Sequence, residues 1–197
     1  MIKSREEYRE YLREDRRALG LSNLGVSRAI IELIAPNYIW RFQKLLRRLE
    51  YIGNCHKRAF FGFNYLILKL RFRRLSLRLG FSIPENVFGP GLAIVHYGTI
   101  VVNANAKVGK NCRLHPSTCI GASGGDSRAP VIGDNVYIAP GVKIYGDIRI
   151  GNNVATAANA AVCDSFEEEN ILIGGVPAKK IKVIDIARII KHTGQGL

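Results

Sequence analysis

The chain has 197 residues, of which 47% are hydrophobic, and it carries a formal net charge of +13. This length allows one domain or two small ones, and no stretch reaches the ~18 consecutive apolar residues of a membrane-spanning helix. Four cysteines without a CxxC pair or a Cys/His cluster argue against a disulfide framework and against a zinc site. We therefore expect reduced thiols, no metal and a cytoplasmic protein, because the charged N-terminus is unlike a signal peptide.

The first 80 residues are expected to form a basic α-helical domain. They hold 18 Lys and Arg against 7 Asp and Glu, so most of the net charge lies there. The segment Ser4 to Glu7 has the form of a capping box and predicts a helix over residues 4–19. Further helices are expected over residues 27–35, 37–49 and 57–79. No nucleic-acid-binding motif accompanies the charge, so we expect no nucleic acid partner.

The last of these helices combines large apolar residues with seven cations. Residues 58–79 include three phenylalanines before position 65, followed by a leucine-rich run that contains Lys69 and four arginines. An apolar surface edged with arginine suits a helix that lies on an anionic membrane surface. The alternative is a helix that faces another subunit with a solvated basic edge, and the sequence leaves both open.

Residues 81–183 show a repeat of six residues. A period of six fits neither an α-helix nor alternating strands in hairpins, and it is typical of short strands wound around a triangular prism. We therefore expect a mainly β fold, with a parallel β-helix over residues 81–183 behind the helical domain, and a tail over residues 184–197. The interior positions are expected to be Val102, Val108, Leu114, Ile120, Ile132, Ile138, Ile144, Ile150, Thr156 and Val162.

Several features resemble the left-handed β-helix acyltransferases, and in particular their serine O-acetyltransferase branch. They are the hexapeptide run, a Gly-Gly-Asp sequence at residues 124–126 in a polar excursion that interrupts the repeat, and Gly-Val-Pro-Ala-Lys at residues 175–179. The resemblance covers residues 83–183 and implies a left-handed parallel β-helix of hexapeptide repeats. It also implies acetyl-CoA as the acyl donor and a homotrimer, or a hexamer, whose active sites lie between subunits.

The same resemblance assigns catalytic roles. His96, in the segment 94–101, would be the general base that takes the proton of an acceptor hydroxyl as the thioester is attacked. His115 is a second candidate acid or base, with a solvated wall residue as its alternative. His56 and His192 lie outside the β-helix and are expected to be surface or packing residues.

Further binding residues follow from the resemblance. In the excursion, Asp126 and Arg128 would bind polar groups of the acceptor. Glycines and other small residues would let backbone approach the CoA arm, and two lysines would meet its phosphates. These cofactor-binding candidates are Gly124, Gly125, Pro140, Gly141, Ala157, Ala158, Lys179 and Lys180.

The acceptor is predicted from two departures from the serine O-acetyltransferase pattern. Val95 replaces an aspartate before His96, and Phe81 replaces an aspartate fifteen residues upstream of it. A zwitterionic amino acid needs an anion for its ammonium group, which argues against serine. Members of the resembling family that lack these residues often acetylate sugars, so the resemblance implies a sugar hydroxyl of a surface polysaccharide, acetylated at the inner membrane face. The alternatives are L-serine, as in cysteine biosynthesis, and a β-helix scaffold without catalysis.

Overall fold

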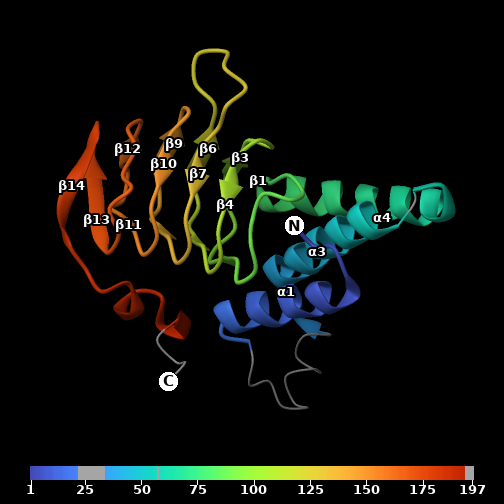
Figure 1. The fold of residues 1–197 in the computed structure, drawn as a ribbon. Coiled ribbons are helices and arrows are strands. Elements are labelled where there is room, and N and C mark those ends of the chain that lie inside the picture. The colour runs from blue at the N-terminus through green and yellow to red at the C-terminus, as the bar shows by residue number, and fades with distance from the viewer. Residues whose placement is uncertain (22–33, 57, 194–197) are drawn as a thin grey trace.

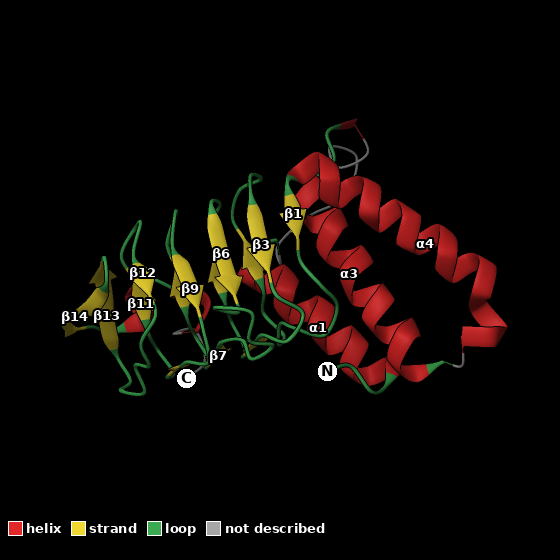
Figure 2. Cartoon of the chain, turned by 90° about the horizontal axis from the view of Figure 1, so that it is seen from above, coloured by secondary structure: helices red, strands yellow, loops and turns green. Residues whose placement is uncertain are grey.

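The computed structural model describes residues 1–21, 34–56 and 58–193, without the side chains of residues 58–61. A group of helices precedes a β-helix and packs against its first coil (Figures 1 and 2). The helices are α1 (Arg5–Ala18), α3 (Tyr38–Cys55) and α4 (Arg58–Leu79). Most of the helix predicted over residues 27–35 lies outside the described residues.

Two helix starts follow the capping signals in the sequence. The Oγ of Ser4 accepts the amide of Glu7 at 3.1 Å, which confirms the predicted N-terminus of α1. Asn37 caps α3 in the same way. Helix α3, however, continues six residues beyond the predicted end to Cys55. Its residues Leu49 and Glu50 are buried, so tertiary packing stabilises the helix beyond the predicted last residue.

The β-helix consists of strands of two to six residues that form three sheets. One sheet has the order β1-β3-β6-β9-β12, the second β10-β7-β4, and the third β14-β13-β11-β8-β5-β2. All pairings within the named sheets are parallel except that of β13 with β14. The strands are β1 (Phe81–Ser82), β2 (Ala93–Ile94), β3 (Ile100–Val102), β4 (Lys107–Val108), β5 (Arg113–Leu114), β6 (Thr118–Gly121), β7 (Val131–Ile132), β8 (Tyr137–Ile138), β9 (Lys143–Tyr145), β10 (Arg149–Ile150), β11 (Ala155–Thr156), β12 (Ala161–Val162), β13 (Ile171–Gly175) and β14 (Ala178–Val183).

The six-residue repeat marks the interior of the prism, as predicted. Every predicted interior position from Val102 to Val162 is at most 5% exposed. Because each coil contributes one such residue to each of three walls, the branched side chains stack into a continuous apolar core.

The glycines that follow several of these residues lie where successive coils touch. A Cβ on Gly109 would lie 2.7 Å from the backbone of Gly133, and a Cβ on Gly133 would lie 2.8 Å from that of Gly151. Glycine therefore allows successive coils to approach closely at this corner. Asparagines take the left-handed conformation instead, and Asn111, Asn135 and Asn153 form a hydrogen-bonded ladder with N–O distances of 2.8 and 2.9 Å.

A buried ionic cluster joins the helices to the first coil. The guanidinium of Arg47 donates to the carboxylate of Asp15 at 2.8 and 3.2 Å, and to the carbonyl oxygens of Phe88 and Gly89. Burial alone would lower the pKa of Arg47, but the carboxylates of Asp15 and Glu50 raise it overall, so the group stays charged. The helical domain is therefore fixed to the β-helix by paired charges as well as by apolar contacts.

The chain ends in a tail that returns along the outside of the third sheet. It contains the short 3₁₀ helices η1 (Ile186–Arg188) and η2 (Lys191–Thr193). Ile186 and Ile190 pack against Ala155, with Tyr137 and Leu172 beside them. The tail thus covers part of the sheet face and reaches the C-terminal end of α1, where Arg17 Nη2 donates to the carbonyl oxygen of His192 at 3.1 Å.

The predicted fold class needs one correction. The helices have 14, 18 and 22 residues, whereas the longest strand has six, so the chain combines α and β structure and is not mainly β. Among the described residues, no helix is long and apolar enough to cross a membrane. All four cysteines are free, and burial raises the pKa of Cys112 to about 12, so this thiol is unreactive.

Candidate active site

His96 and His115 come together at one corner of the β-helix. His96 follows β2 and is exposed, while His115 follows β5 on the next coil and is half-buried. Strands β2 and β5 pair in register through Ile94 and Leu114, which brings the two histidines close. Their ring centroids lie 6.4 Å apart. The structure therefore brings together the two residues predicted to be catalytic.

The environment of His115 keeps its imidazole neutral. Burial lowers its pKa to about 4, and the nearby charges of Arg113 and His96 act in the same direction. Its ring also contacts Tyr137, with centroids 5.0 Å apart. Nε2 of His115 is buried and has no hydrogen-bond partner among the described residues. Such a buried nitrogen is costly unless a bound molecule supplies a partner, so it is a candidate contact for a ligand.

A line of small residues begins at His115 and crosses the following coils. The strand registers place Ala139, Ala157 and Gly174 level with His115 on successive coils. Backbone hydrogen bonds continue at this level, for example from the His115 amide to the Ile138 carbonyl at 3.1 Å. We call these four residues the small-residue column. No side chain in it beyond His115 extends past Cβ, but Ala139 is only 4% exposed and Ile181 lies beside Gly174, so a ligand would contact mainly the exposed neighbours of the column.

Some of the predicted donor-binding residues lie in or beside this column, and the others lie elsewhere on the β-helix. Ala157 belongs to it, and Ala158 and Pro140 are exposed neighbours that follow β11 and β8. Gly141 has φ = 80°, which favours glycine at this turn. The two lysines, Lys179 and Lys180, are exposed on β14, and Lys180 pairs with Glu168.

The excursion between β6 and β7 projects from the edge of the β-helix, where it is the yellow loop in Figure 1. Asp126 and Arg128 pair with each other at 2.6 Å, and Arg128 also pairs with Asp147 at 2.6 Å. The hydrogen bonds and charge of Arg128 lower the pKa of Asp126 to about 2. Gly124 and Gly125 have φ values of 60° and 79°, so this loop requires glycine there. The loop thus presents a preformed carboxylate–guanidinium pair to solvent.

Sequence reasoning missed several residues of this site. Tyr137, Ala139 and Gly174 were not predicted, although they flank or extend the small-residue column. A count of 18 residues per regular coil, which separates position 139 from 157, could have found the column. The excursion hides this spacing on the earlier coils.

The two departures at Phe81 and Val95 have structural consequences. Phe81 is buried and its ring packs edge-on against Phe42 at 5.0 Å, so this position belongs to the core beneath α3. Val95 is half-buried, and its amide donates to the Leu114 carbonyl at 3.1 Å. Neither residue can supply a charge beside His96.

Comparisons with known proteins place this site in context. Residues 129–164 match the family model of the bacterial transferase hexapeptide (six repeats). A serine acetyltransferase of Staphylococcus aureus strain Mu50 is 33% identical over 101 residues, which are 50% of this chain and 47% of that protein. The chain thus spans about half the length of the curated relatives it matches.

Two solved structures share the fold. The serine acetyltransferase of Neisseria gonorrhoeae in complex with serine aligns with a TM-score of 0.68 and 24% identity, over 91% of this chain and 71% of that chain. The serine acetyltransferase of Brucella abortus strain S19 in complex with coenzyme A aligns with a TM-score of 0.68 and 23% identity, over 92% and 70%. A coil of opposite hand could not superpose over such lengths, so the β-helix winds in the same sense as in these proteins.

These comparisons correct the predicted function. The prediction of a polysaccharide acetyltransferase is wrong, because the relatives and the solved structures are named serine acetyltransferases. For the identity of the acceptor, the missing aspartate beside His96 was weaker evidence than the similarity of the whole β-helix to that of serine acetyltransferases. The six-residue repeats of residues 129–164 match the model of the bacterial transferase hexapeptide.

Proposed function

We propose that the protein transfers the acetyl group of acetyl-CoA to the hydroxyl of L-serine. The observation that carries this proposal is the pair formed by exposed His96 and half-buried His115 at the start of the small-residue column. Similarity to serine acetyltransferases supports the donor and the acceptor. L-serine was the alternative acceptor in the sequence analysis.

In this mechanism His96 acts as the general base. Its imidazole takes the proton of the serine hydroxyl as the oxygen attacks the thioester carbonyl carbon. The C–S bond of the resulting tetrahedral intermediate then breaks, and the imidazolium returns the proton to the leaving thiolate. No acyl-enzyme is required, because the two substrates react directly when held together.

His115 would position the substrates rather than exchange protons with them. With a pKa of about 4 it is neutral at pH 7, so one ring nitrogen donates and the other accepts. Its ring centroid lies 6.4 Å from that of His96, and its buried Nε2 lacks a protein partner among the described residues. A hydrogen bond from a bound substrate would satisfy this nitrogen and fix the substrate beside the base.

The donor and acceptor would occupy different parts of the site. The thin pantetheine arm would lie along the small-residue column and contact its exposed neighbours Pro140 and Ala158. Because Val95 cannot bind an ammonium group, we assign the ammonium and carboxylate of serine to Asp126 and Arg128, which would exchange their mutual pair for the zwitterion. The site would be completed by a neighbouring copy, in a homotrimer.

Thiol release from acetyl-CoA in the presence of L-serine tests this proposal. His96→Ala should lower kcat by about 10²–10⁴-fold, the usual contribution of a general base. His56→Gln is the matched control, since His56 lies beyond the end of α3, and it should retain full activity. Circular dichroism checks that both variants are folded.

Two results would contradict the assignment. Unchanged acetyl transfer by His96→Ala would contradict the assignment of His96 as the general base. Transfer to L-threonine or glycerol in preference to L-serine would contradict the assignment of L-serine as the acceptor. Arg128→Gln separates acceptor binding from chemistry, because it should raise the KM for L-serine with little effect on that for acetyl-CoA.

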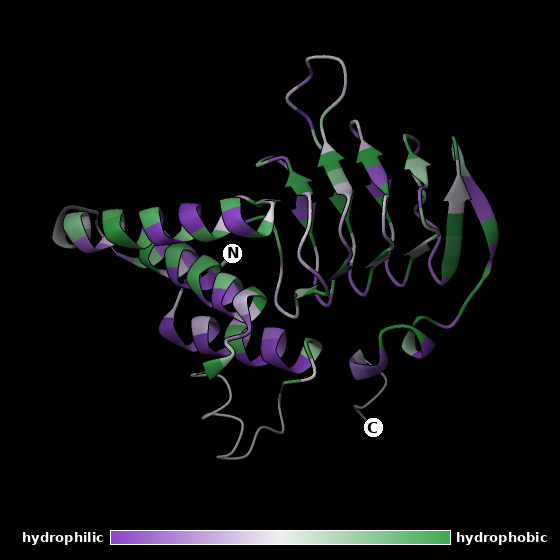
Figure 3. Ribbon diagram, turned by 180° about the vertical axis from the view of Figure 1, so that it is seen from behind, coloured by the Kyte–Doolittle hydropathy of each residue, from purple (hydrophilic) through white to green (hydrophobic). Residues whose placement is uncertain are grey.

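We also propose that α4 docks on an anionic membrane surface. Its large apolar residues form two opposite stripes, and apolar and polar residues alternate along it in Figure 3. Leu68 and Leu79 are buried on one side. The opposite side exposes Phe63, Leu66, Leu70 and Leu77. Lys69 and the arginines at positions 71, 73, 74 and 78 flank this exposed stripe, and the helix has no acidic residue. A second copy of the same basic helix would be repelled, whereas anionic lipid would be attracted.

Liposome flotation tests this docking. The protein should float with vesicles of phosphatidylserine and phosphatidylcholine but not with pure phosphatidylcholine, and Leu66→Glu/Leu70→Glu should abolish flotation while leaving the melting temperature unchanged. Failure to float at physiological salt would contradict the proposal. So would concentration-dependent self-association that the same double variant removes, because the stripe would then bind a second copy.

A further inference from the structure

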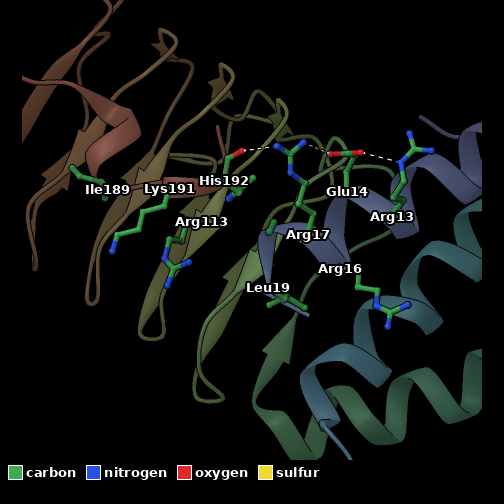
Figure 4. A pocket seen from close by; sticks show the side chains of 11 residues that line it. Arg13, Glu14, Arg16, Arg17, Leu19, Arg113, Ile189, Lys191 and His192 are labelled. Atoms are coloured by element: carbon green, nitrogen blue, oxygen red, sulfur yellow. Dashed lines mark hydrogen bonds and ion pairs between the residues drawn. The ribbon is translucent and has the colours of Figure 1, made fainter. Parts of the chain in front are cut away.

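A basic cavity adjoins the coil that carries His115, but neither histidine of the candidate active site lines it. Its lining residue Arg113 lies on β5, two residues before His115. It has a volume of about 830 Å³ and lies between the C-terminal end of α1, β5 and η2. Figure 4 shows the side chains that line it, which come from these three segments although the segments are far apart in the sequence. The cavity exists only because the C-terminal tail returns along the sheet to α1.

The charge of this cavity is strongly one-sided. Among the described residues that line it are five fixed cations, against one carboxylate, that of Glu14. Glu14 pairs with Arg13 at 3.2 Å and with Arg17 at 3.9 Å. No carboxylate among the described residues pairs with the remaining cations of the cavity. The cations are Arg13, Arg16, Arg17, Arg113 and Lys191.

The simplest explanation of basic residues at the end of α1 is the helix dipole. Cations in the last turn of a helix are stabilised by its C-terminal carbonyl groups, and this accounts for Arg16 and Arg17. It does not account for Arg113, which is on a strand of the β-helix, or for Lys191, which is in the tail. Bringing these charges together costs repulsion that a bound anion would relieve.

The surroundings of the His192 side chain show the same positive potential. Its imidazole lies in the cavity, and Nε2 is 3.4 Å from Oδ1 of Asn111. Burial lowers the pKa of His192, and the charges of Arg17 and Arg113 lower it further, against an opposing effect of Glu14. Lys191 precedes it in η2. An anion placed among these cations would therefore raise the pKa of His192.

The size of the cavity limits the kind of anion. Pockets for small organic ligands have volumes of roughly 300–1,000 Å³, so a single phosphate ion would leave most of this space to water. Guanidinium groups bind phosphate oxygens through paired hydrogen bonds, and a lysine adds a mobile point charge. Several cations in one cavity are therefore a better match for a chain of linked phosphates than for a single carboxylate group.

We propose that this cavity is a binding site for an oligophosphate, separate from the acetyl-transfer site. Arg113 and Lys191 hold the phosphates from the β-helix and the tail, and the arginines of α1 hold them from the helical domain. The bound anion adds a link between three segments that are already joined by the hydrogen bond from Arg17 to the His192 carbonyl, so it stabilises the docked tail. The shared chemistry is an inorganic oligophosphate or the phosphate chain of a nucleotide.

Isothermal titration calorimetry with sodium tripolyphosphate at physiological salt tests the site in the intact chain. Arg113→Gln/Lys191→Gln removes two cations of the cavity. The matched control is Arg149→Gln/Lys107→Gln, which removes two exposed cations from the sheet β10-β7-β4. We expect about tenfold weaker binding for each cavity cation removed, and no change in the control.

Nuclear magnetic resonance of the four histidines locates the ligand independently of affinity. The pKa of His192 should rise on addition of tripolyphosphate, and the ring signals of His56 should not respond to the ligand. His192→Gln identifies the signal. Parallel titrations with ATP and with inorganic tripolyphosphate show whether a nucleoside adds to the affinity, and either order is consistent with an oligophosphate site.

Three results would overturn the proposal. They are no binding at physiological salt, equal loss of binding in the two double variants, and displacement of tripolyphosphate by CoA accompanied by a raised KM for acetyl-CoA in the cavity variant. The last result would make these cations part of the donor site. The binding measurements use no acetyl acceptor, so they remain valid if the proposed acetyl transfer fails.

Discussion

At the scale of single residues, the candidate site depends on the different surroundings of two histidines on neighbouring coils. His96 is exposed and open to substrate, whereas His115 is half-buried against Tyr137 and has an unsatisfied Nε2. This division fits one proton carrier and one neutral partner. The sequence could not show which histidine has which role, because the burial of His115 depends on how three coils align in the folded chain.

The lowered pKa of His115 predicts how stability changes with pH. The unfolded chain binds a proton at this residue below about pH 6.5, whereas the folded chain does so only near pH 4. Between these values the unfolded state holds more protons, so the free energy of unfolding falls as the pH falls. Urea denaturation from pH 4 to 7 should show this slope, and His115→Gln should flatten it. An equal slope in both proteins would contradict the prediction.

At the scale of elements, the corners of the coils determine the packing of the β-helix. The column Gly89, Gly109, Gly133 and Gly151 lets each coil rest on the backbone of the next, with no room for a Cβ. Asparagines at the neighbouring corner supply the left-handed turns and hydrogen-bond to each other. Glycine therefore allows the coils to touch, and asparagine makes the turns between the strands.

Gly133→Ala tests the close approach of the coils. The added Cβ would lie 2.8 Å from the backbone of Gly151, which cannot move without displacing a coil. We expect a loss of about 1–3 kcal/mol in the free energy of unfolding, measured by urea denaturation. Gly62→Ala is the control, because it lies in α4 with nothing within 4 Å, and it should be neutral or stabilising.

The sequence predicted the elements that depend on local pattern. The interior positions of the prism and the cap of α1 follow from spacings of six and three residues, and both are confirmed. The end of α3 and the pair of Arg47 with Asp15 were not predicted. That pair joins residues 32 apart and buries two charges, which only the assembled structure can make favourable.

The candidate site was predicted only in part for the same reason. His96 and His115 stand near recognisable repeats, but the small-residue column depends on which coils lie side by side. The acceptor was misjudged because single substitutions at positions 81 and 95 outweighed the pattern of the whole domain. The basic cavity could not be foreseen, since it joins residues from both ends of the chain.

At the scale of the whole molecule, the exposed position of His96 predicts that one chain is insufficient for catalysis. A general base open to solvent requires a second wall to exclude water and hold the substrates. We expect a homotrimer, with a light-scattering mass three times that of one chain. Specific activity should fall on dilution below the trimer dissociation constant, and a fully active monomer would contradict this prediction.

The two ends of the β-helix are closed in different ways. Phe42 and Leu46 of α3 lie against the interior of the first coil, and Asp15 accepts the amides of Gly91 and Leu92. At the other end, β14 turns back antiparallel and exposes lysines. An uncovered coil offers a template on which further copies can stack into fibres. By covering the first coil, the helical domain therefore also prevents end-to-end stacking of copies, so the β-helix keeps the length of a single chain.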